Sequence, residues 1–314
     1  MIKFAKGALL AGAAAVALGG TAFAAGTLTD AEFKCEASVS KAGAKFVGAK
    51  SKCASKCLAN ADKSLNPYTD CYVPYGGATA ECIDDTTLDL KGAEDKFRDA
   101  IRKACDPSFK TSLDPDACPE CYSSGDCSTS GEATNRVSNI EGQVDSFGPG
   151  VYCDRPGASP AEIKCEGSTA KALVKQVGGV DKCYDKCNSN IRKSLIAPGQ
   201  CNPPSPADAV TSACIAKVDG KAILSIAKAC GGECLGGDNT CGSNTGTCTV
   251  DKGLTQCGCA TDCDAAGGDQ TIKPNCSNPD DYPTGAAWVN LVDIAISGTV
   301  PGTYCASPSG AFLQ

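Results

Sequence analysis

Two groups of closely spaced cysteines have the spacing that thiol chemistry requires. Cys118-Pro119-Glu120-Cys121 is a C-x-x-C motif, which performs redox chemistry when a strand precedes it and a helix follows it. Here the motif follows Asp114-Pro115-Asp116 in a polar loop, so we expect a structural role. Cys257, Cys259 and Cys263 form a denser group, and four thiolates can hold zinc. We expect disulfides in an oxidising compartment, assign no metal and no cofactor, and keep a thiol redox or metal-binding protein as an alternative.

Lysines form a stripe along one side of a predicted helix, and the stripe recurs in a second helix. At 100° per residue, the six lysines of each helix fall within about 60° of one another. One interpretation is a ridge that binds an anionic glycan or another anionic surface. The other is a solvated helix face, which is the commoner meaning of such a stripe. The lysines are Lys34, Lys41, Lys45, Lys52, Lys56 and Lys63, then Lys164, Lys171, Lys175, Lys182, Lys186 and Lys193.

From this set we take eight lysines as candidate ligand-binding residues: Lys34, Lys45, Lys52, Lys56, Lys164, Lys175, Lys182 and Lys186. The competing interpretation pairs the stripe with nearby aspartates, which are Asp84, Asp85, Asp89, Asp95 and Asp99.

Three tyrosines, Tyr68, Tyr72 and Tyr75, lie close together between Pro67 and Gly77. Such rings can stack on a sugar, and Tyr72 is our candidate for that contact. More often they cover a disulfide or a helix end, which is what we expect here. Acids are plentiful, but a carboxylate-pair hydrolase holds two of them at a fixed separation. The sequence offers no way to choose that pair.

The chain contains no histidine, and its only methionine is Met1. The absence of histidine excludes a Ser-His-Asp or Cys-His catalytic group, a histidine-ligated metal and a C-x-x-C-H haem attachment site. We therefore lean against an enzyme. The formal net charge is −7, and an acidic protein repels phosphates, so nucleic acid is not an expected partner.

The first 24 residues resemble a signal peptide. Lys3 and Lys6 precede an apolar run from Ala8 to Ala17, and Ala22-Phe23-Ala24 is a small-x-small cleavage site. The apolar run is too short to span a bilayer, and no later run is long enough. We expect a secreted or extracellular protein, with the periplasm as an alternative location. Removing Lys3 and Lys6 would take the formal charge from −7 to −9.

The rest of the chain contains an internal repeat. Four cysteines recur 130 residues later without a gap: Cys35, Cys53, Cys57 and Cys71 match Cys165, Cys183, Cys187 and Cys201. Each copy closes with a similar signature, Pro149-Gly150-Val151-Tyr152-Cys153 and Pro301-Gly302-Thr303-Tyr304-Cys305. A Pro/Gly/Ser-rich linker follows the first signature. We expect two repeats, at residues 25–155 and 156–314.

Apolar spacing predicts the helices of each repeat. In the first copy we expect a long helix from Thr29 to Leu65, with Thr29 as its N-cap, a second helix from Thr86 to Cys105, and a short third one before the closing signature. The counterpart of the second helix runs from Ala207 to Cys230. The predicted fold class is mainly α and disulfide-rich, with two tandem homologous units. Each unit is a helical hairpin plus a cysteine-stapled loop and a short third helix.

Helix geometry suggests a disulfide pattern. Cys35, Cys53 and Cys57 face the same side of the first helix, because 18 residues make five turns. An antiparallel second helix then pairs the ends, and the turn closes with a third bond. The proposed pairs are Cys35–Cys105, Cys53–Cys82 and Cys57–Cys71, with Cys165–Cys230, Cys183–Cys214 and Cys187–Cys201 in the second copy. Each bond contributes about 2–4 kcal/mol of stability, which compensates for few aromatic core residues.

Two features of the chain carry a resemblance to a known group of proteins. One is the lysine- and alanine-rich helix with its widely spaced cysteines, Lys34-Cys35, Lys52-Cys53 and Lys56-Cys57, and the other is the returning Ile101-Arg102-Lys103-Ala104-Cys105. Together they resemble uncharacterised cysteine-rich exported repeat proteins of environmental bacteria. The resemblance covers the two helical hairpins, about half the chain. It implies a secreted repeat protein and no known activity.

These observations predict a secreted, non-catalytic structural or surface-interaction protein held by about twelve disulfides. The alternative is a binding module for a glycan or a protein, with the lysine ridge as its contact. Candidate partners are therefore an anionic glycan or a cell-surface protein.

Overall fold

The structure is a computed structural model, and it describes residues 29–84, 91–105, 119, 132–152, 156–230, 241–242, 247–248 and 285–304. These residues fold mainly into helices, which confirms the predicted mainly α, disulfide-rich class. The elements are α1 (Asp30–Ala61), η1 (Tyr68–Cys71), α2 (Gly77–Ile83), α3 (Ala93–Cys105), α4 (Glu132–Tyr152), α5 (Pro160–Arg192), α6 (Ala209–Ala229), β1 (Cys241–Gly242), β2 (Thr247–Cys248) and α7 (Gly285–Thr303). The two strands pair antiparallel with each other.

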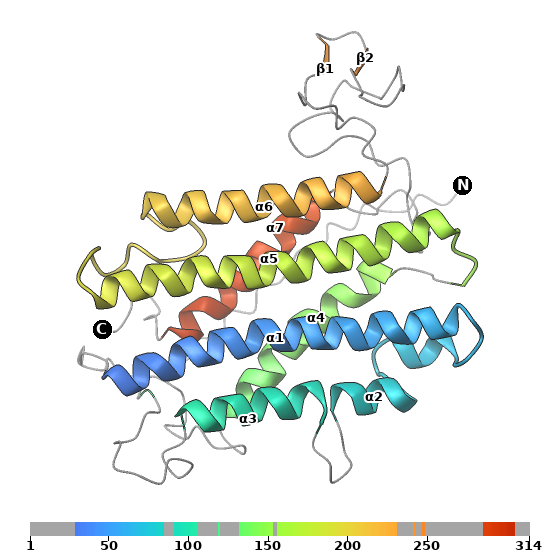
Figure 1. The fold of residues 1–314 in the computed structure, drawn as a ribbon, viewed down its shortest axis with the longest axis horizontal. Helices are drawn as coiled ribbons and strands as arrows, with labels where there is room; N and C mark the ends of the chain where they lie inside the picture. Colours follow the sequence, from blue (N-terminus) through green and yellow to red (C-terminus); the bar gives the residue numbers. More distant parts are fainter. Residues whose placement is uncertain are drawn as a thin grey trace, which may run out of the picture.

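The long helices form a layer in which α6, α5, α1 and α3 follow one another side by side, and α4 and α7 cross behind it (Figure 1). The helices α1 and α5 are antiparallel neighbours. Arg192, at the end of α5, forms an ion pair with Asp30 at the start of α1, with an N–O distance of 2.7 Å. The two helices that carry the lysine stripes therefore lie next to each other at the centre of the layer.

Both central helices begin with the same local device. The Thr29 side chain accepts a hydrogen bond from the backbone of Glu32, and the Glu32 carboxylate accepts one from the Thr29 backbone. Ser159 and Glu162 repeat this arrangement at the start of α5. Such a capping box satisfies backbone N–H groups that a helix start otherwise leaves unpaired. The predicted N-cap at Thr29 is confirmed.

The first helix ends earlier than predicted, at Ala61 and not at Leu65. Ser64 adopts a φ of 57°, and the Leu65 N–H donates to the Asn60 carbonyl at 3.0 Å. This is the closing bond of a Schellman turn, which reverses the chain and ends the helix. In the second copy Ser194 has a φ of 56° at the corresponding place.

Replacing Ser64 with glycine should raise the free energy of unfolding by about 0.5–1 kcal/mol, because a left-handed backbone strains any residue that carries a Cβ. Urea unfolding followed by circular dichroism measures this difference. The matched change Ser38→Gly, in the interior of α1, should instead lower stability by up to about 1 kcal/mol. A destabilised Ser64→Gly variant would contradict the assigned turn.

The second helix of the first copy starts later than predicted, at Ala93 and not at Thr86, and a separate short helix precedes it. Cys82 belongs to α2, whereas the helix that ends at Cys105 starts only at Ala93; residues 85–90 lie outside the described part. In the second copy α6 is continuous from Ala209 to Ala229, with Asp208 as its N-cap. The apolar spacing at Leu90 therefore extended the prediction too far toward the N-terminus.

The third helices, predicted to end before the closing signatures, extend into them. In the first copy α4 ends at Tyr152, and in the second α7 continues past Pro301 to Thr303. A proline inside a helix removes one backbone hydrogen bond, but α7 loses it only in its last turn. This extension places Tyr152 and Tyr304 in the core, where each is buried.

The apolar core has two parts. A smaller cluster joins α1, α3 and α4 around Phe46 and Phe97, whose rings stack with centroids 5.4 Å apart. The larger cluster includes the C-terminal half of α1, the end of α4, and α5, α6 and α7. Because this cluster extends across residue 156, the two predicted repeats share one core. The boundary between them remains a prediction from the sequence.

Among the residues that the structure describes, six disulfides tie the helices together, and they are the six pairs that the helix geometry predicts. Each copy has a bond between the start of its long helix and the end of its returning helix, as in Cys35–Cys105 and Cys165–Cys230. The cysteine groups at 118–121 and 257–263 lie outside the described residues. None of the described helices combines the length and apolarity needed to cross a membrane.

Candidate functional site

All twelve stripe lysines have exposed side chains. Around α1, three of its four sides are covered: α5 lies on one, α3 on the opposite one, and α4 behind. The α1 residues that point at these neighbours, such as Phe46 and Ala44, lie about 90–110° around the helix from the mean direction of the lysines. The lysines therefore occupy the remaining side, away from α4.

The same argument holds for α5, which has α1 and α6 beside it and α7 behind. Since α4 and α7 cross on the same side of the layer (Figure 1), the two lysine stripes point to the opposite side together. We call this surface, defined by the twelve stripe lysines, the lysine face. From Lys34 to Lys56, the last stripe lysine within α1, a stripe is about 33 Å long at 1.5 Å per residue.

A groove between α1 and α3 widens the lysine face. Lys41 and Lys45 line it from α1, and Lys96 and Lys103 line it from α3. Its floor is made of alanines and the stacked rings of Phe46 and Phe97. A molecule bound there would meet ammonium groups on both sides.

The predicted aspartate partners of the stripe are engaged elsewhere. Asp84 and Asp95 form ion pairs with Arg98, and Asp99 pairs with Lys103; Asp85 and Asp89 lie outside the described part. Among the described residues, no stripe lysine has a carboxylate within ion-pair distance. The positive charge of this face is thus not neutralised by the neighbours proposed for it.

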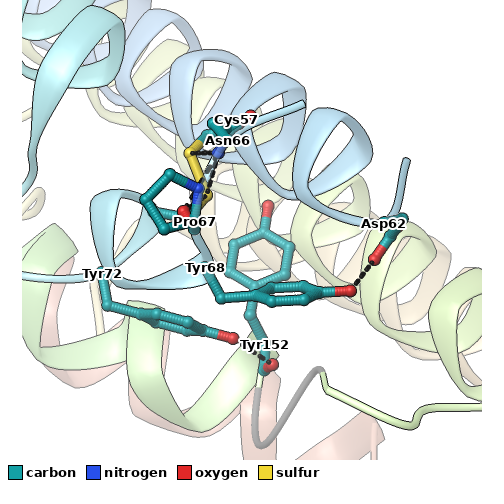
Figure 2. The surroundings of a disulfide bond; sticks show 8 residues. Cys57, Asp62, Asn66, Pro67, Tyr68, Tyr72 and Tyr152 are labelled. Atoms are coloured by element: carbon teal, nitrogen blue, oxygen red, sulfur yellow. Dashed lines mark hydrogen bonds between the residues drawn. A yellow bond between two sulfur atoms is a disulfide. The ribbon is translucent and has the colours of Figure 1, made fainter. Parts of the chain in front are cut away.

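Tyr72 is half-buried, and it packs against the core. Figure 2 shows its hydroxyl donating to the Tyr152 carbonyl, at 3.3 Å. Tyr68 donates to Asp62 at 2.9 Å, and Asn66 donates to the Cys57 sulfur at 3.3 Å. Tyr68 and Tyr72 therefore lie beside the disulfide that closes the turn, Cys57–Cys71. Sugar stacking by Tyr72 remains an untested prediction.

One lysine of α1 is fully buried. Lys50 forms ion pairs with Glu141 at 2.5 Å and Asp145 at 2.7 Å, both on α4. Its ammonium also lies 5.3 Å from the centre of the Tyr75 ring, a cation–π geometry. The burial of Lys50 could have been predicted from the sequence, because Lys50 follows Phe46 by one helix turn and therefore lies on the apolar face of the helix. Lys50 lies outside the predicted lysine stripe, and its burial was not predicted.

Carboxyl groups on the second and third helices meet in both copies. Burial, together with a hydrogen bond to Glu141, raises the pKa of Glu94 to about 8. Burial also acts to raise the pKa of Glu141, but hydrogen bonds with Lys50 and Glu94 hold it below its usual value. Glu94 therefore holds a proton more readily than an ordinary glutamate, although it also forms an ion pair with Arg98 at 2.7 Å. The two carboxyl groups are in direct contact, closer than the separation of about 5 Å or more that glycoside hydrolysis requires.

The second copy has a similar pair, Asp219 and Asp293, both hydrogen-bonded to the buried Gln176 side chain at 3.2 and 2.9 Å. Burial and the neighbouring Asp219 raise the pKa of Asp293 to about 6. Glu94 and Asp219 each lie eleven residues before the last cysteine of their hairpin. The sequence alone shows that Glu94 and Asp219 occupy corresponding positions, but it does not show which helix each of them packs against.

The free energy of unfolding should fall as the pH rises from 5 to 8. Burial, and then the charge of Asp185, raise the pKa of Asp181 to about 8, so the folded state keeps a proton that the unfolded chain loses near its ordinary value. A folded state that binds one extra proton loses about 1.4 kcal/mol of stability per pH unit in that window. Urea unfolding at several pH values measures the slope, and Asp181→Asn should make it shallower. An unchanged slope in that variant would contradict the protonated carboxyl.

In the described part of the chain, no three histidine, cysteine, aspartate or glutamate side chains come together as metal ligands. Fold and site together define a disulfide-stapled, mainly α-helical protein with a segregated basic face. Comparisons with known protein families, curated proteins and solved structures find no match to this chain.

Proposed function

We propose that the chain is an exported, non-catalytic surface-interaction protein whose lysine face binds an anionic polymer, with an acidic polysaccharide as the partner class. The observation that carries the proposal is the position of the lysines. Two antiparallel helices place ten exposed ammonium groups on one side of a protein whose formal net charge is −7, and the exposed Lys63 and Lys193 follow the ends of these helices. Grouped on one side, these cations give an acidic protein a surface that attracts anions.

The length of the stripes favours a polymer over a small anion. Successive stripe lysines lie four or seven residues apart, which is about 6 or 10 Å along the helix. No two such groups enclose a single small ion, but a linear polyanion can contact many of them at once. Each contact is weak in water, and their sum gives a binding strength that depends on salt.

The cysteines favour a stable scaffold for this face. Both ends of α1 and of α5 are held by disulfides to a neighbouring segment. Such bonds persist in the oxidising compartments outside the cytoplasm, which agrees with the signal peptide predicted from the sequence. A rigid pair of helices keeps the lysine spacing fixed, so less conformational entropy is lost on binding.

The proposal is tested with dextran sulfate as the polyanion. Neutralising two lysines of one stripe, in Lys45→Gln/Lys52→Gln, should weaken binding about three- to tenfold at low salt. The matched control is Asn139→Glu/Asn290→Glu, which changes the net charge by the same amount. Both of its positions are exposed, on α4 and α7, and we expect binding within twofold of the unaltered protein. Equal weakening in the two variants would show that only net charge matters, and would overturn the proposed face.

A further inference from the structure

An apolar cavity of about 130 Å³ lies behind the seam between α1 and α5. The two central helices form one wall, with Val47 and Val177 among the lining residues, and α4 and α7 form the other, with Val144 and Ile296. Most of the lining residues are aliphatic or aromatic. The cavity is therefore on the opposite side of the helix layer from the lysine face.

The cavity lies where the two halves of the chain meet symmetrically. A Cβ on Gly48 would lie 3.3 Å from Val174, and one on Gly178 would lie 4.0 Å from Ala44. These are the same contact viewed from each helix, because Gly48 and Gly178, like Ala44 and Val174, are 130 residues apart. Every cavity residue of α4 likewise has its counterpart, 152 residues later, lining the cavity from α7.

The cavity therefore lies at the junction of the two halves, and corresponding residues of the two halves line it from both sides. Filling the cavity would need a larger side chain at both residues of a corresponding pair. Several pairs instead combine a large and a small residue, such as Gly43 with Leu173 and Phe147 with Thr299. Interiors normally pack without voids larger than a water molecule, so an apolar space of this size is unusual.

Several of the polar groups that line the cavity are already engaged. Lys50 is held by its two carboxylates, and the Tyr72 hydroxyl by the Tyr152 carbonyl. Asp181, from α5, lines the cavity, and it forms no hydrogen bond or ion pair with any residue that the structure describes. Because burial raises the pKa of Asp181 to about 8, it is an uncharged carboxyl at neutral pH. Such a group can both donate and accept.

We propose that this cavity binds a small, uncharged, mainly apolar molecule of the aromatic or short aliphatic alcohol class. Its hydrocarbon part lies between α4 and α7, and its hydroxyl is hydrogen-bonded to Asp181. The volume fits one ring, since a dry apolar cavity of about 150 Å³ binds benzene. Apolar pockets with one or two convergent polar groups are the usual form of small-molecule sites. The inference is independent of polyanion binding, because it uses none of the stripe lysines.

The test uses the oxidised full chain and two probes of similar size, benzyl alcohol and toluene, with binding followed by two-dimensional NMR titration. Benzyl alcohol should bind with a dissociation constant on the order of 1 mM or tighter. Toluene should bind roughly three- to tenfold more weakly, because it leaves the carboxyl without a partner. In Asp181→Ala the two probes should bind alike.

A second variant tests the location. Ala295→Leu adds three carbons inside the cavity and should weaken both probes at least tenfold. The control Ala216→Leu adds the same group at an exposed position of α6 and should change neither. Circular dichroism checks that each variant is folded. The proposal would be overturned if neither probe showed saturable binding, or if Ala295→Leu left binding unchanged. If Ala295→Leu does not fold, the deciding result is the Asp181→Ala variant. A preference for benzyl alcohol that survives in Asp181→Ala would then overturn the proposal.

Discussion

Removing the disulfide between Cys35 and Cys105, by replacing both with alanine, should lower the free energy of unfolding by about 4 kcal/mol. The bond joins residues 70 apart in sequence, and constraining a long loop removes much of the unfolded chain's entropy. Removing Cys57–Cys71, whose separation is 14, should cost about 3 kcal/mol. Urea unfolding of the two double variants measures the difference.

Both disulfides are buried, so the loss of packing is similar in the two variants, and the comparison isolates loop length. Peptide mapping of the unreduced protein is the accompanying check on connectivity. A fragment in which Cys35 is joined to Cys53 would contradict the assigned pairs. So would a Cys57/Cys71 variant that is less stable than the Cys35/Cys105 variant.

Replacing Lys50 with methionine should destabilise the fold by about 3 kcal/mol. Methionine preserves the packing of the long side chain, but the variant leaves Glu141 and Asp145 without their cation, and breaking a buried ion pair is costly because it leaves uncompensated charge. The same substitution at the exposed Lys45 is the matched control, and it should change stability by less than about 0.5 kcal/mol. Thermal and urea unfolding distinguish the two.

A second substitution tests the cause of the stability loss predicted for Lys50→Met. If the cost comes from unpaired carboxylates, adding Asp145→Asn to Lys50→Met should recover part of the lost stability. Lys50→Met and Lys45→Met variants of equal stability would mean that the ion pairs between α1 and α4 contribute nothing.

The sequence predicted those parts of the fold that depend on local spacing. The N-cap at Thr29 follows from a hydroxyl with an acid three residues later, and the pairing of Cys35 with Cys105 follows from helix phase. The end of α1 could not be predicted, because Ser64 is not a residue type that favours a left-handed backbone. The break between α2 and α3 and the extension of α7 past Pro301 depend on packing against other helices, which one sequence does not reveal.

The candidate site divides in the same way. Helix periodicity groups the lysines into stripes, and it predicts that they share one side of each helix. That both stripes share one side of the molecule depends on how α1 and α5 pack, and needed the structure. The carboxyl pair Glu94 and Glu141, and the cavity with Asp181, join helices far apart in sequence. Periodicity gives no register between such helices, so these sites were missed.

The central claim is that the lysine face binds a polyanion through many weak contacts, and its most direct test is binding of the unaltered, oxidised protein to dextran sulfate across a series of salt concentrations. The proposal predicts clear binding at about 20 mM salt, where surface charges are only weakly screened. It also predicts an affinity that falls linearly on logarithmic axes as salt rises, and no binding to uncharged dextran. Absence of binding at low salt, or equal binding to the two polymers, would contradict it.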